Sequence, residues 1–411
     1  TDPYAGKFYR VFRGIVERAI RVRFLTMGTL VALLVVALIG FGKIDQMFFP
    51  DSSMTKFMID YWAPEGTRIQ AVAEDLEKAE NKFLGDERVA SVTTFTGAGP
   101  PRFYLPVDPE SPYQSYAQFI VNVKEYRDIS DLLNELGVWF DEEYPQALIP
   151  MRRYGVGPSN TWKFELRISG PSTADSATLR SLAGQVVAIV EANPLSADAR
   201  ANWRQRVQKV VPEYNQERAR WAAVSREDIA DATKRAYDGL SIGLYREEDD
   251  LIPIVMRHVE EERASVGNMK ALQVQPGSST HSIPLAQVTD GIITEWEDPL
   301  IWRRDRRRTI TVESNPIFGV TLPTLRASVL GQIEAIELPP GYAMEWGGEH
   351  EDTVDSQASL LPGIIPTAGV ILFIIVALFN AFRPPLVIIL TVPFAVIGIT
   401  AGLLATGTPF G

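Results

Sequence analysis

Long uncharged stretches are the strongest hydrophobic pattern in this chain. Three of them contain no Asp, Glu, Lys, Arg or His: Phe24–Gly42, Leu360–Phe382 and Pro384–Gly411, of 19, 23 and 28 residues. About 20 apolar residues span a bilayer as a helix, so the pattern predicts transmembrane helices over residues 24–43, 360–382 and 386–411. A proton relay needs ionisable groups at membrane depth, and these stretches supply none.

The residues before the first span predict its orientation. Only Asp2 and Glu17 oppose six cations, which are Lys7, Arg10, Arg13, Arg18, Arg21 and Arg23. Because basic flanks stay in the cytoplasm, we expect the N-terminus there and the segment between the first two spans outside. A cleaved signal peptide would have a shorter apolar core and an Ala-x-Ala site, so we favour a retained helix.

Residues 1–23 have a helical pattern of their own. Their apolar positions share one helix face and basic residues occupy the other, the apolar set being Phe8, Val11, Phe12, Ile15, Ala19 and Val22. The pattern predicts a cytoplasmic amphipathic helix. It fits a helix at the lipid headgroups, and it fits equally well one that contacts the rest of the protein.

Between the first two spans, strand and helix patterns alternate. Residues 54–155 predict strand, helix, strand, strand, helix and strand over Met54–Trp62, Thr67–Phe83, Val89–Phe95, Ala117–Val123, Ile129–Glu143 and Leu148–Arg153. Two βαβ units in this order indicate a split βαβ sandwich.

A second sandwich is predicted in two pieces, residues 160–213 and 302–348. Its elements are Trp162–Ile168, Ser176–Glu191, Asp198–Val211, Thr309–Glu313, Leu322–Ile336 and Tyr342–Trp346. Residues 214–301 form an insertion between the pieces.

The insertion has its own signals. Ser225 and Asp228 form a capping-box pattern at the start of a predicted helix, Ser225–Tyr237. Leu240–Leu244 and Leu251–Arg257 then resemble the arms of a hairpin with an acidic tip. Such a tip is a poor surface for lipid or nucleic acid, and a solvated hairpin end is the simplest interpretation.

Composition excludes several classes of protein. With 46% hydrophobic and 22% charged residues, an intrinsically disordered chain is excluded. The absence of Cys excludes disulfides, thiolate catalysis and Cys-bearing zinc sites. A net charge of −11 argues against general nucleic-acid binding, so we interpret the Arg303–Arg308 run as structural ion pairs. His258, His281 and His350 lack ligand spacing, and we predict no metal site from them.

Several short runs, in this order, resemble one family. They are Ala63-Pro64-Glu65-Gly66-Thr67, Tyr245 to Arg257 (YREEDDLIPIVMR), Ile283 to Val288 (IPLAQV), Ala381-Phe382-Arg383-Pro384-Pro385, Val392-Pro393 and Gly407-Thr408-Pro409-Phe410-Gly411. No single run is diagnostic, but the ordered set resembles the C-terminal half of a resistance-nodulation-division transporter. The subgroup is the hydrophobe/amphiphile efflux permeases of Gram-negative inner membranes.

This resemblance implies a fold and a mechanism. The fold is a set of membrane α-helical spans plus an α+β periplasmic porter domain of ferredoxin-like βαβ subdomains with an inserted docking subdomain. The implied activity is export of hydrophobic or amphiphilic drugs and biocides by alternating access, driven by the proton motive force without a cofactor. The implied partners are two further copies in a homotrimer, a periplasmic adaptor, an outer-membrane channel and the bilayer, with no nucleic acid. The implied protein is a multi-pass secondary transporter and not an enzyme, and its proton-carrying residues lie in spans beyond these three.

The resemblance also implies substrate contacts. Trp162, Phe164 and Leu166 share one face of a strand that would line a pocket between the subdomains. Aromatic rings bind varied apolar ligands, although an ordinary core face gives the same pattern. Met58 and Arg200 match family pocket positions, and Asp60 would favour cationic or neutral ligands; the alternative for both charged residues is a solvated or paired charge.

A glycine-rich segment occupies the position of the family's switch loop. Phe95, Gly97 and Gly99 fit it, because glycine lets the backbone change conformation. The sequence departs from the family at Ala98, where an aromatic residue is usual, and Pro100-Pro101 stiffens the loop. Phe103 and Tyr104 would supply the aromatic rings from a shifted position, and an ordinary surface loop is the alternative.

Two other functions stay open. Export of Cu(I) or Ag(I) by the same superfamily needs a cluster of soft thioethers, for which Met54, Met58 and Met151 are the candidates. A membrane-anchored assembly or protein-translocation module fits the docking-type insertion, but it does not require the aromatic strand.

Overall fold

The computed structural model describes residues 7–157, 161–277 and 279–411 of the chain. The chain divides into two units. The first comprises Thr1–Arg204 and Leu300–Gly411, and the second comprises Gln205–Pro299. The first unit contains the first predicted sandwich, most of the second and the apolar helices, while residues 205–213 of the second prediction fall in the second unit.

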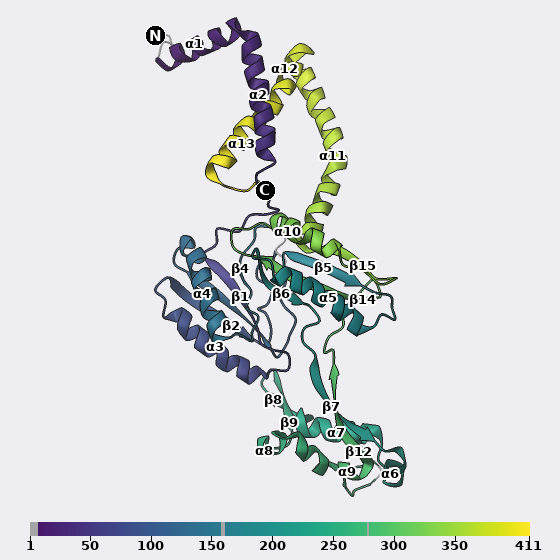
Figure 1. The fold of residues 1–411 in the computed structure, drawn as a ribbon. Coiled ribbons are helices and arrows are strands. Elements are labelled where there is room, and N and C mark those ends of the chain that lie inside the picture. Colours follow the sequence, from purple (N-terminus) through teal and green to yellow (C-terminus); the bar gives the residue numbers. More distant parts are fainter. Residues whose placement is uncertain (1–6, 158–160, 278) are drawn as a thin grey trace. The chain divides into compact units, whose positions relative to one another are not determined.

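The first sheet has four antiparallel strands in the order β2-β3-β1-β4. The strands are β1 (Lys56–Trp62), β2 (Val89–Thr96), β3 (Tyr116–Val123) and β4 (Met151–Arg153). Helices α3 (Ile69–Leu84) and α4 (Ile129–Glu143) cover one face, and the short helix η1 (Tyr126–Asp128) precedes α4 (Figure 1). This βαββαβ order and pairing are ferredoxin-like, as the sequence pattern predicts.

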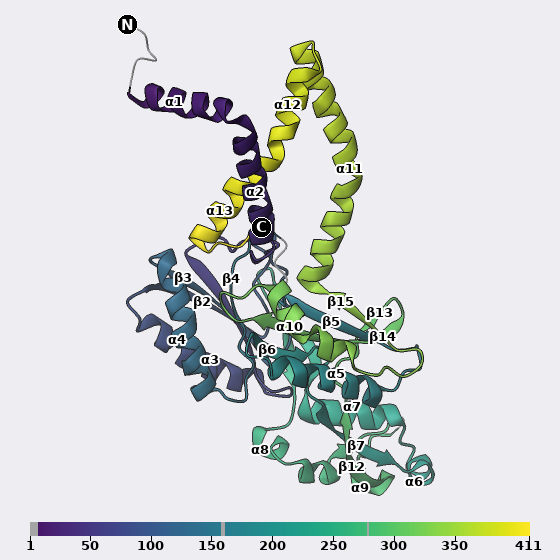
Figure 2. The same ribbon diagram turned by 45° about the horizontal axis from the view of Figure 1, so that its top comes forward.

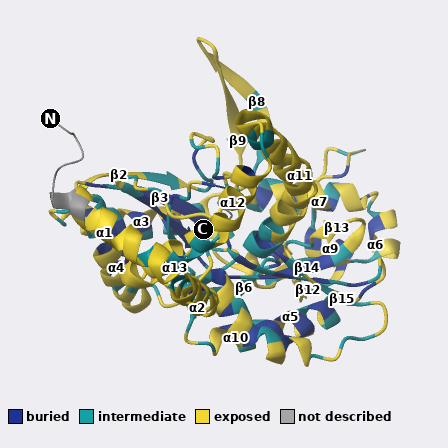
Figure 3. Cartoon of the chain, turned by 90° about the horizontal axis from the view of Figure 1, so that it is seen from above, coloured by how far each residue is buried: buried dark blue, intermediate teal, exposed yellow. Residues whose placement is uncertain are grey.

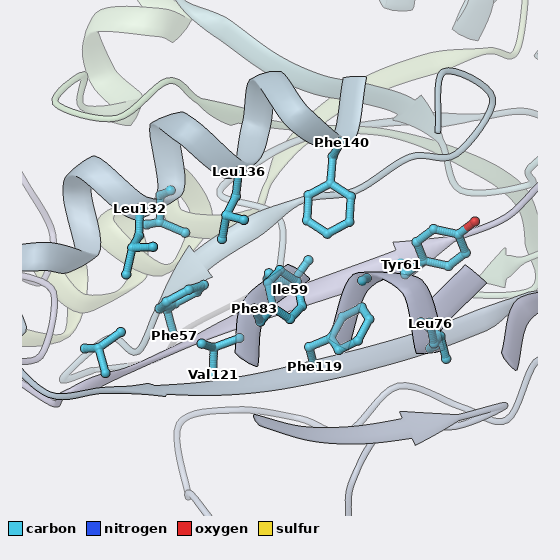
Figure 4. Packing of buried hydrophobic residues seen from close by; sticks show 14 of the residues in the cluster. Phe57, Ile59, Tyr61, Leu76, Phe83, Phe119, Val121, Leu132, Leu136 and Phe140 are labelled. Atoms are coloured by element: carbon cyan, nitrogen blue, oxygen red, sulfur yellow. The ribbon is translucent and has the colours of Figure 1, made fainter. Parts of the chain in front are cut away.

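Helix-facing side chains of this sheet form a continuous apolar core. The buried residues of α3 and α4 recur every three or four positions, which puts them on one side of each helix. Figure 4 shows these residues meeting the strands; the labelled members are Phe57, Ile59, Tyr61, Leu76, Phe83, Phe119, Val121, Leu132, Leu136 and Phe140. The rings of Phe83 and Phe119 meet edge to face at 5.1 Å.

The second sheet repeats this topology with an interruption. Strand β14 (Arg307–Pro316) pairs with β5 (Phe164–Ser169) and β6 (Ser196–Ala201), and β5 also pairs with β15 (Ala343–Gly347). Helices α5 (Ser176–Glu191) and α10 (Leu322–Glu334) lie beside this sheet (Figure 2). Their buried apolar side chains share one core with those of its strands. The chain leaves this sheet after β6 and returns at β13 (Arg303–Arg304) and β14.

Three residues of the arginine run make structural contacts, of which one is an ion pair of the predicted kind and the others are hydrogen bonds to backbone carbonyls. Arg304 lies 3.2 Å from Glu351 in an ion pair. Arg307 donates to the carbonyl oxygens of Gly170 and Gly341, and Arg308 donates to that of Ala174. These bonds join strand β14 to neighbouring loops.

The second unit is built on paired strands and short helices. Strand β7 (Val207–Tyr214) pairs with β12 (Thr289–Glu297), β8 (Leu240–Glu247) with β9 (Asp250–Met256), and β10 (Gln273–Val274) with β11 (Ile283–Pro284). The helices are α6 (Gln216–Trp221), α7 (Arg226–Tyr237), α8 (Glu260–Arg263), η2 (Val266–Ala271) and α9 (Leu285–Val288). The predicted capping box is confirmed, because Ser225 Oγ accepts from the Asp228 backbone N–H and the Asp228 carboxylate accepts from the Ser225 N–H. Every residue of β9 is exposed (Figure 3).

One predicted extended segment forms two separate strands in the structure. The sequence predicts one extended segment, Asp198–Val211, in the second sandwich. Its first part is β6, which joins that sheet. Its second part falls in β7, which pairs with β12 in the second unit, so the predicted segment is divided between the two units.

Among the described residues, three helices are long and apolar enough to cross a membrane: Arg23–Phe41 (α2), Gly348–Phe379 (α11) and Arg383–Thr406. The last comprises α12 (Arg383–Thr391), η3 (Val392–Phe394) and α13 (Ala395–Thr406). Helix α1 (Lys7–Arg21) precedes α2, and α11 begins well before its uncharged stretch. The apolar side chains of the three long helices are largely exposed, which suits lipid contact (Figure 3).

Candidate functional site

A polar cavity of about 250 Å³ lies where the helix-free faces of the two sheets meet. Both subdomains contribute to its lining, which consists of Trp62, Asp108, Glu110, Tyr113, Thr161, Trp162, Glu165, Arg200, Asn202, Arg204, Leu300, Trp302 and Glu313. All of these residues belong to the first unit. The cavity therefore has three tryptophans, two arginines and four carboxylic acids on its walls.

Trp62 is the last residue of strand β1 and lines this cavity. Residues alternate between the faces of a strand, so Phe57, Ile59 and Tyr61 enter the helix-side core. Trp62 takes the opposite face and stacks against Tyr116 at a centroid distance of 4.3 Å. Both faces of β1 are buried, and for that reason its sequence lacks the alternation of a half-exposed strand.

The guanidinium group of Arg200 lies over two indole rings. Its Cζ is 4.6 Å from the Trp62 ring centroid and 4.5 Å from that of Trp162. Arg204 is 4.4 Å from the Trp62 ring and forms an ion pair with Glu65 at 3.0 Å. Trp62 comes from the first sandwich and Trp162 from the second, so Arg200 joins the two subdomains by cation–π contacts.

Carboxylates lie beside the arginines. The strand registers place Glu165 opposite Glu313 and Glu313 opposite Arg200, and the Arg200 Nε donates to Glu313 at 2.8 Å. Burial raises the pKa of Glu313 to about 7, although the positive charge of Arg200 acts in the other direction. Burial also raises the pKa values of Glu110 and Glu165 above their ordinary value.

Asp60 lies beneath this surface and is fully buried. It accepts hydrogen bonds from the Tyr116 hydroxyl and the Gln118 amide, both at 2.6 Å, and from Arg152 Nε at 3.2 Å. The expectation that Asp60 selects ligands by its charge is therefore corrected. Its charge is already compensated, and no part of its side chain reaches the cavity surface.

The other predicted contacts divide between cavity and core. Trp162 and Arg200 line the cavity. Phe164 and Leu166 are buried in the helix-side core of the second sheet, because strand alternation turns them away from Glu165. The prediction that all three residues of the Trp162 strand line a pocket is wrong for these two, since strand β5 begins only at Phe164 and Trp162 precedes it.

The three methionines do not form a thioether cluster. Met58 is buried in a small cluster with Val107 and Tyr154, against which Met54 packs. Met151 packs against the other core, near Gly137 of helix α4. Met58 and Met151 thus lie on opposite faces of the first sheet.

The predicted switch loop covers the helix-free face of the first sheet. Gly97 has φ +82°, exchanges backbone hydrogen bonds with Tyr113 and Tyr116, and follows the half-buried Phe95 of β2. Tyr104 packs on the Met58 cluster and donates to the Gly155 carbonyl oxygen. The remaining predicted residues lie apart from the cavity lining: Phe103 is 53% exposed, and Ala98 and Gly99 are half-buried.

Sequence reasoning missed several cavity residues: Trp62, Glu110, Tyr113, Arg204, Trp302 and Glu313. One of them had a signal. Met58, Asp60 and Trp62 are spaced two residues apart on strand β1, so their side chains point to the same face of the sheet. Because Met58 and Asp60 were predicted to line the pocket, the same spacing predicts Trp62 as well. The others come from loops or from a strand on the far side of the insertion, and their approach depends on tertiary structure.

In the described part of the chain, no group of three or more His, Cys, Asp and Glu side chains is placed to hold a metal ion. Two of the cavity carboxylates form ion pairs with arginines, Glu313 with Arg200 and Glu165 with Arg167.

The first unit thus joins two antiparallel sheets, with a cavity between them, to helices long and apolar enough to cross a membrane. The chain belongs to the AcrB/AcrD/AcrF family, whose model matches residues 5–411. This confirms the family that the ordered motifs indicate.

The named relatives are metal-resistance proteins. The cobalt-zinc-cadmium resistance protein CzcA of Cupriavidus metallidurans is 24% identical over 57% of this chain. The nickel and cobalt resistance protein CnrA of the same organism is 27% identical over 45% of the chain. The chain spans only 22% and 17% of the lengths of these two relatives.

Solved structures show the same fold. A heavy metal efflux pump in two crystal forms matches with TM-scores of 0.76 and 0.78, at 19% and 18% identity. The matches cover 98% and 97% of this chain and 42% and 41% of the pump. The motifs by themselves also suggest a triclosan-pump permease, TriC, and none of these named relatives supports that narrower identification.

Proposed function

We propose that this chain is part of an inner-membrane permease that exports substrates from the periplasm or the outer leaflet. Its family over residues 5–411 is the observation that carries the proposal. Alternating access would come from rocking of the two sandwiches, whose helix-free faces form the cavity. The working protein would be a homotrimer that contacts an adaptor and an outer-membrane channel through the second unit.

We propose the proton motive force as the energy source. The three uncharged stretches contain no ionisable side chain, so the groups that carry protons would belong to other spans of the whole protein. Such a permease is a secondary transporter and needs no cofactor.

Heavy-metal cations are the substrate class with the better support, because the relatives and the solved pump named above all handle metals. The scattered methionines do not support a Cu(I) or Ag(I) site here. Divalent cations such as those of the named relatives prefer nitrogen and oxygen ligands.

Amphiphilic organic compounds are the second candidate. The observation that favours them is the cavity itself, with indole faces, guanidinium groups and carboxylates but no cluster of metal ligands. Aromatic walls with a few polar groups are typical of sites for organic ligands.

One experiment separates these classes. The full-length gene and its adaptor are expressed in a host without its own pumps, and growth is measured with cobalt, zinc, cadmium, nickel, copper, silver and a panel of dyes and biocides. Resistance to divalent metals alone supports the first class, and resistance to organic compounds alone supports the second. Absence of any resistance, with trimeric protein present in the membrane, would contradict export and favour the non-transporting assembly module.

A further inference from the structure

A separate cavity of about 360 Å³ lies beside the start of helix α11. Its walls come from the N-terminal end of α10, from the first turns of α11 and from the segments that follow α2 and α13. The last two segments are joined, because the Met47 N–H donates to the Phe410 carbonyl oxygen and the Phe410 N–H donates to that of Asp45. All of these elements belong to the first unit, and Figure 1 shows α10 beside the start of α11. The volume is within the range of about 300–1,000 Å³ that is typical of small-ligand sites.

The position of this cavity along α11 indicates what can reach it. Leu360 is the first residue of the uncharged stretch of α11, and it lines the cavity together with Phe48 and Phe410. The predicted span therefore places the cavity where the lipid headgroups meet the hydrocarbon of the bilayer. A molecule that enters it from the bilayer would have an apolar part and a polar head.

Two oppositely charged side chains, Arg326 and Glu349, also line the cavity. The guanidinium carbon of Arg326 lies 4.5 Å from the Trp346 ring centroid, and the Arg326 Nε is buried with no hydrogen-bond partner in the described part of the chain. Neither Arg326 nor Glu349 forms an ion pair with another described residue. A buried donor without a partner costs free energy, so a ligand that accepts from Arg326 would remove that cost.

A headgroup with a phosphate and an ammonium group matches these two charges. Arginine donates to phosphate oxygens through a planar fork of N–H groups, and a carboxylate accepts from a primary ammonium group. A purely anionic headgroup would meet the negative charge of Glu349, and a purely cationic amphiphile would meet the positive charge of Arg326. A zwitterionic headgroup is therefore the better fit, and its acyl chains would continue along the apolar surface that begins at Leu360.

We propose that this cavity holds a phospholipid of the outer leaflet whose headgroup carries a phosphate and a primary ammonium group. The phosphate accepts from Arg326, the ammonium group donates to Glu349, and the acyl chains lie against α11. The bound lipid thereby links α10 of the second sandwich to the helix that enters the membrane. This inference concerns neither the exported substrate nor the cavity between the sandwiches, and it does not rest on the proposed export.

The test measures lipid binding to the purified full-length pump by native mass spectrometry. The detergent micelles contain phosphatidylethanolamine or phosphatidylcholine with the same acyl chains. Because the choline nitrogen has no N–H to donate to Glu349, the wild type is expected to bind phosphatidylethanolamine about tenfold more tightly. Glu349→Gln should lose most of this preference, and Arg326→Ala should bind both lipids about tenfold more weakly than the wild type does.

The matched control is Arg226→Ala, because Arg226 lies 4.6 Å from the Tyr214 ring centroid in the second unit; it should bind both lipids as the wild type does. Equal binding of the two lipids by the wild type, or an unchanged preference in Glu349→Gln, would overturn the proposal. Glu349→Gln keeps the size of the side chain, so it decides the question even if Arg326→Ala does not fold. Unchanged lipid binding by folded Arg326→Ala would also overturn the proposal and would leave Arg326 as a structural cation over Trp346.

Discussion

At the residue scale, Asp60 shows how a buried charge can be structural. Its carboxylate takes hydrogen bonds from Tyr116 and Gln118 on β3 and from Arg152 on β4. We predict that Asp60→Asn lowers the free energy of unfolding by about 3 kcal/mol, because it leaves the buried charge of Arg152 unpaired. Thermal melting of the purified pump measures the loss. Asp108→Asn is the control, since Asp108 pairs with Arg102 while its side chain is 83% exposed, and it should change stability by less than about 1 kcal/mol.

The Arg200–Glu313 pair predicts a pH dependence. Since burial raises the pKa of Glu313 to about 7, this carboxyl is neutral in the folded protein at pH 6 and ionised at pH 8. A raised carboxyl pKa gives stability that is full below the ordinary value of 4.5 and is lost as pH rises through about 7. Arg200 opposes that loss by pairing with the ionised form. We therefore predict that Arg200→Ala lowers the melting temperature more at pH 8 than at pH 6.

The control for this pH effect is Arg200→Ala with Glu313→Gln, which removes the titrating group. Melting of the double variant should depend less on pH than melting of Arg200→Ala. An equal loss at both pH values in Arg200→Ala would show that Glu313 does not ionise in this range.

At the element scale, the loop after β2 depends on one glycine. Gly97 has φ +82°, and an added Cβ would lie 2.7 Å from Ile69 Cδ1. Gly319 has φ +85° with no atom within 4 Å of such a Cβ. We predict that both Gly→Ala changes cost about 1 kcal/mol of backbone strain, and that Gly97→Ala costs about 1 kcal/mol more through the clash.

Ile69→Val removes the clashing methyl group and should return most of that additional loss in the Gly97→Ala background. Melting curves measure stability, and hydrogen exchange over residues 97–113 reports whether the loop loosens. If Gly97→Ala is no more harmful than Gly319→Ala, the contact with Ile69 is unimportant.

Elements were predictable where the pattern is local. Helices α4 and α5 have the bounds that their periodic apolar residues predict, because each helix buries one continuous stripe. The site was less predictable. Trp162 and Phe164 are both aromatic and two residues apart, so the sequence predicts the same environment for both. Strand β5 begins only at Phe164, and Phe164 lies in the core whereas Trp162 lines the cavity. Glu313 reaches Arg200 across an insertion, which no local pattern encodes.

At the scale of the whole molecule, the three apolar helices and the basic leader predict a topology. The N-terminus and the turn between α11 and α12 should be cytoplasmic, and both sandwiches should be periplasmic. The chain has no Cys, so single cysteines introduced into it can report sidedness, provided that any Cys elsewhere in the full-length protein is replaced. Suitable exposed positions are Arg13 in α1, Leu105 in the first sandwich and Phe382 before α12.

We predict that Leu105→Cys reacts with a membrane-impermeant maleimide in intact spheroplasts, because the loop that carries it lies outside. Arg13→Cys and Phe382→Cys should react only after the membrane is permeabilised. Reaction of Arg13→Cys in intact spheroplasts would reverse the first span and contradict the charge argument. Reaction of Phe382→Cys alone would instead show that α11 does not cross the bilayer, which would exclude the predicted topology.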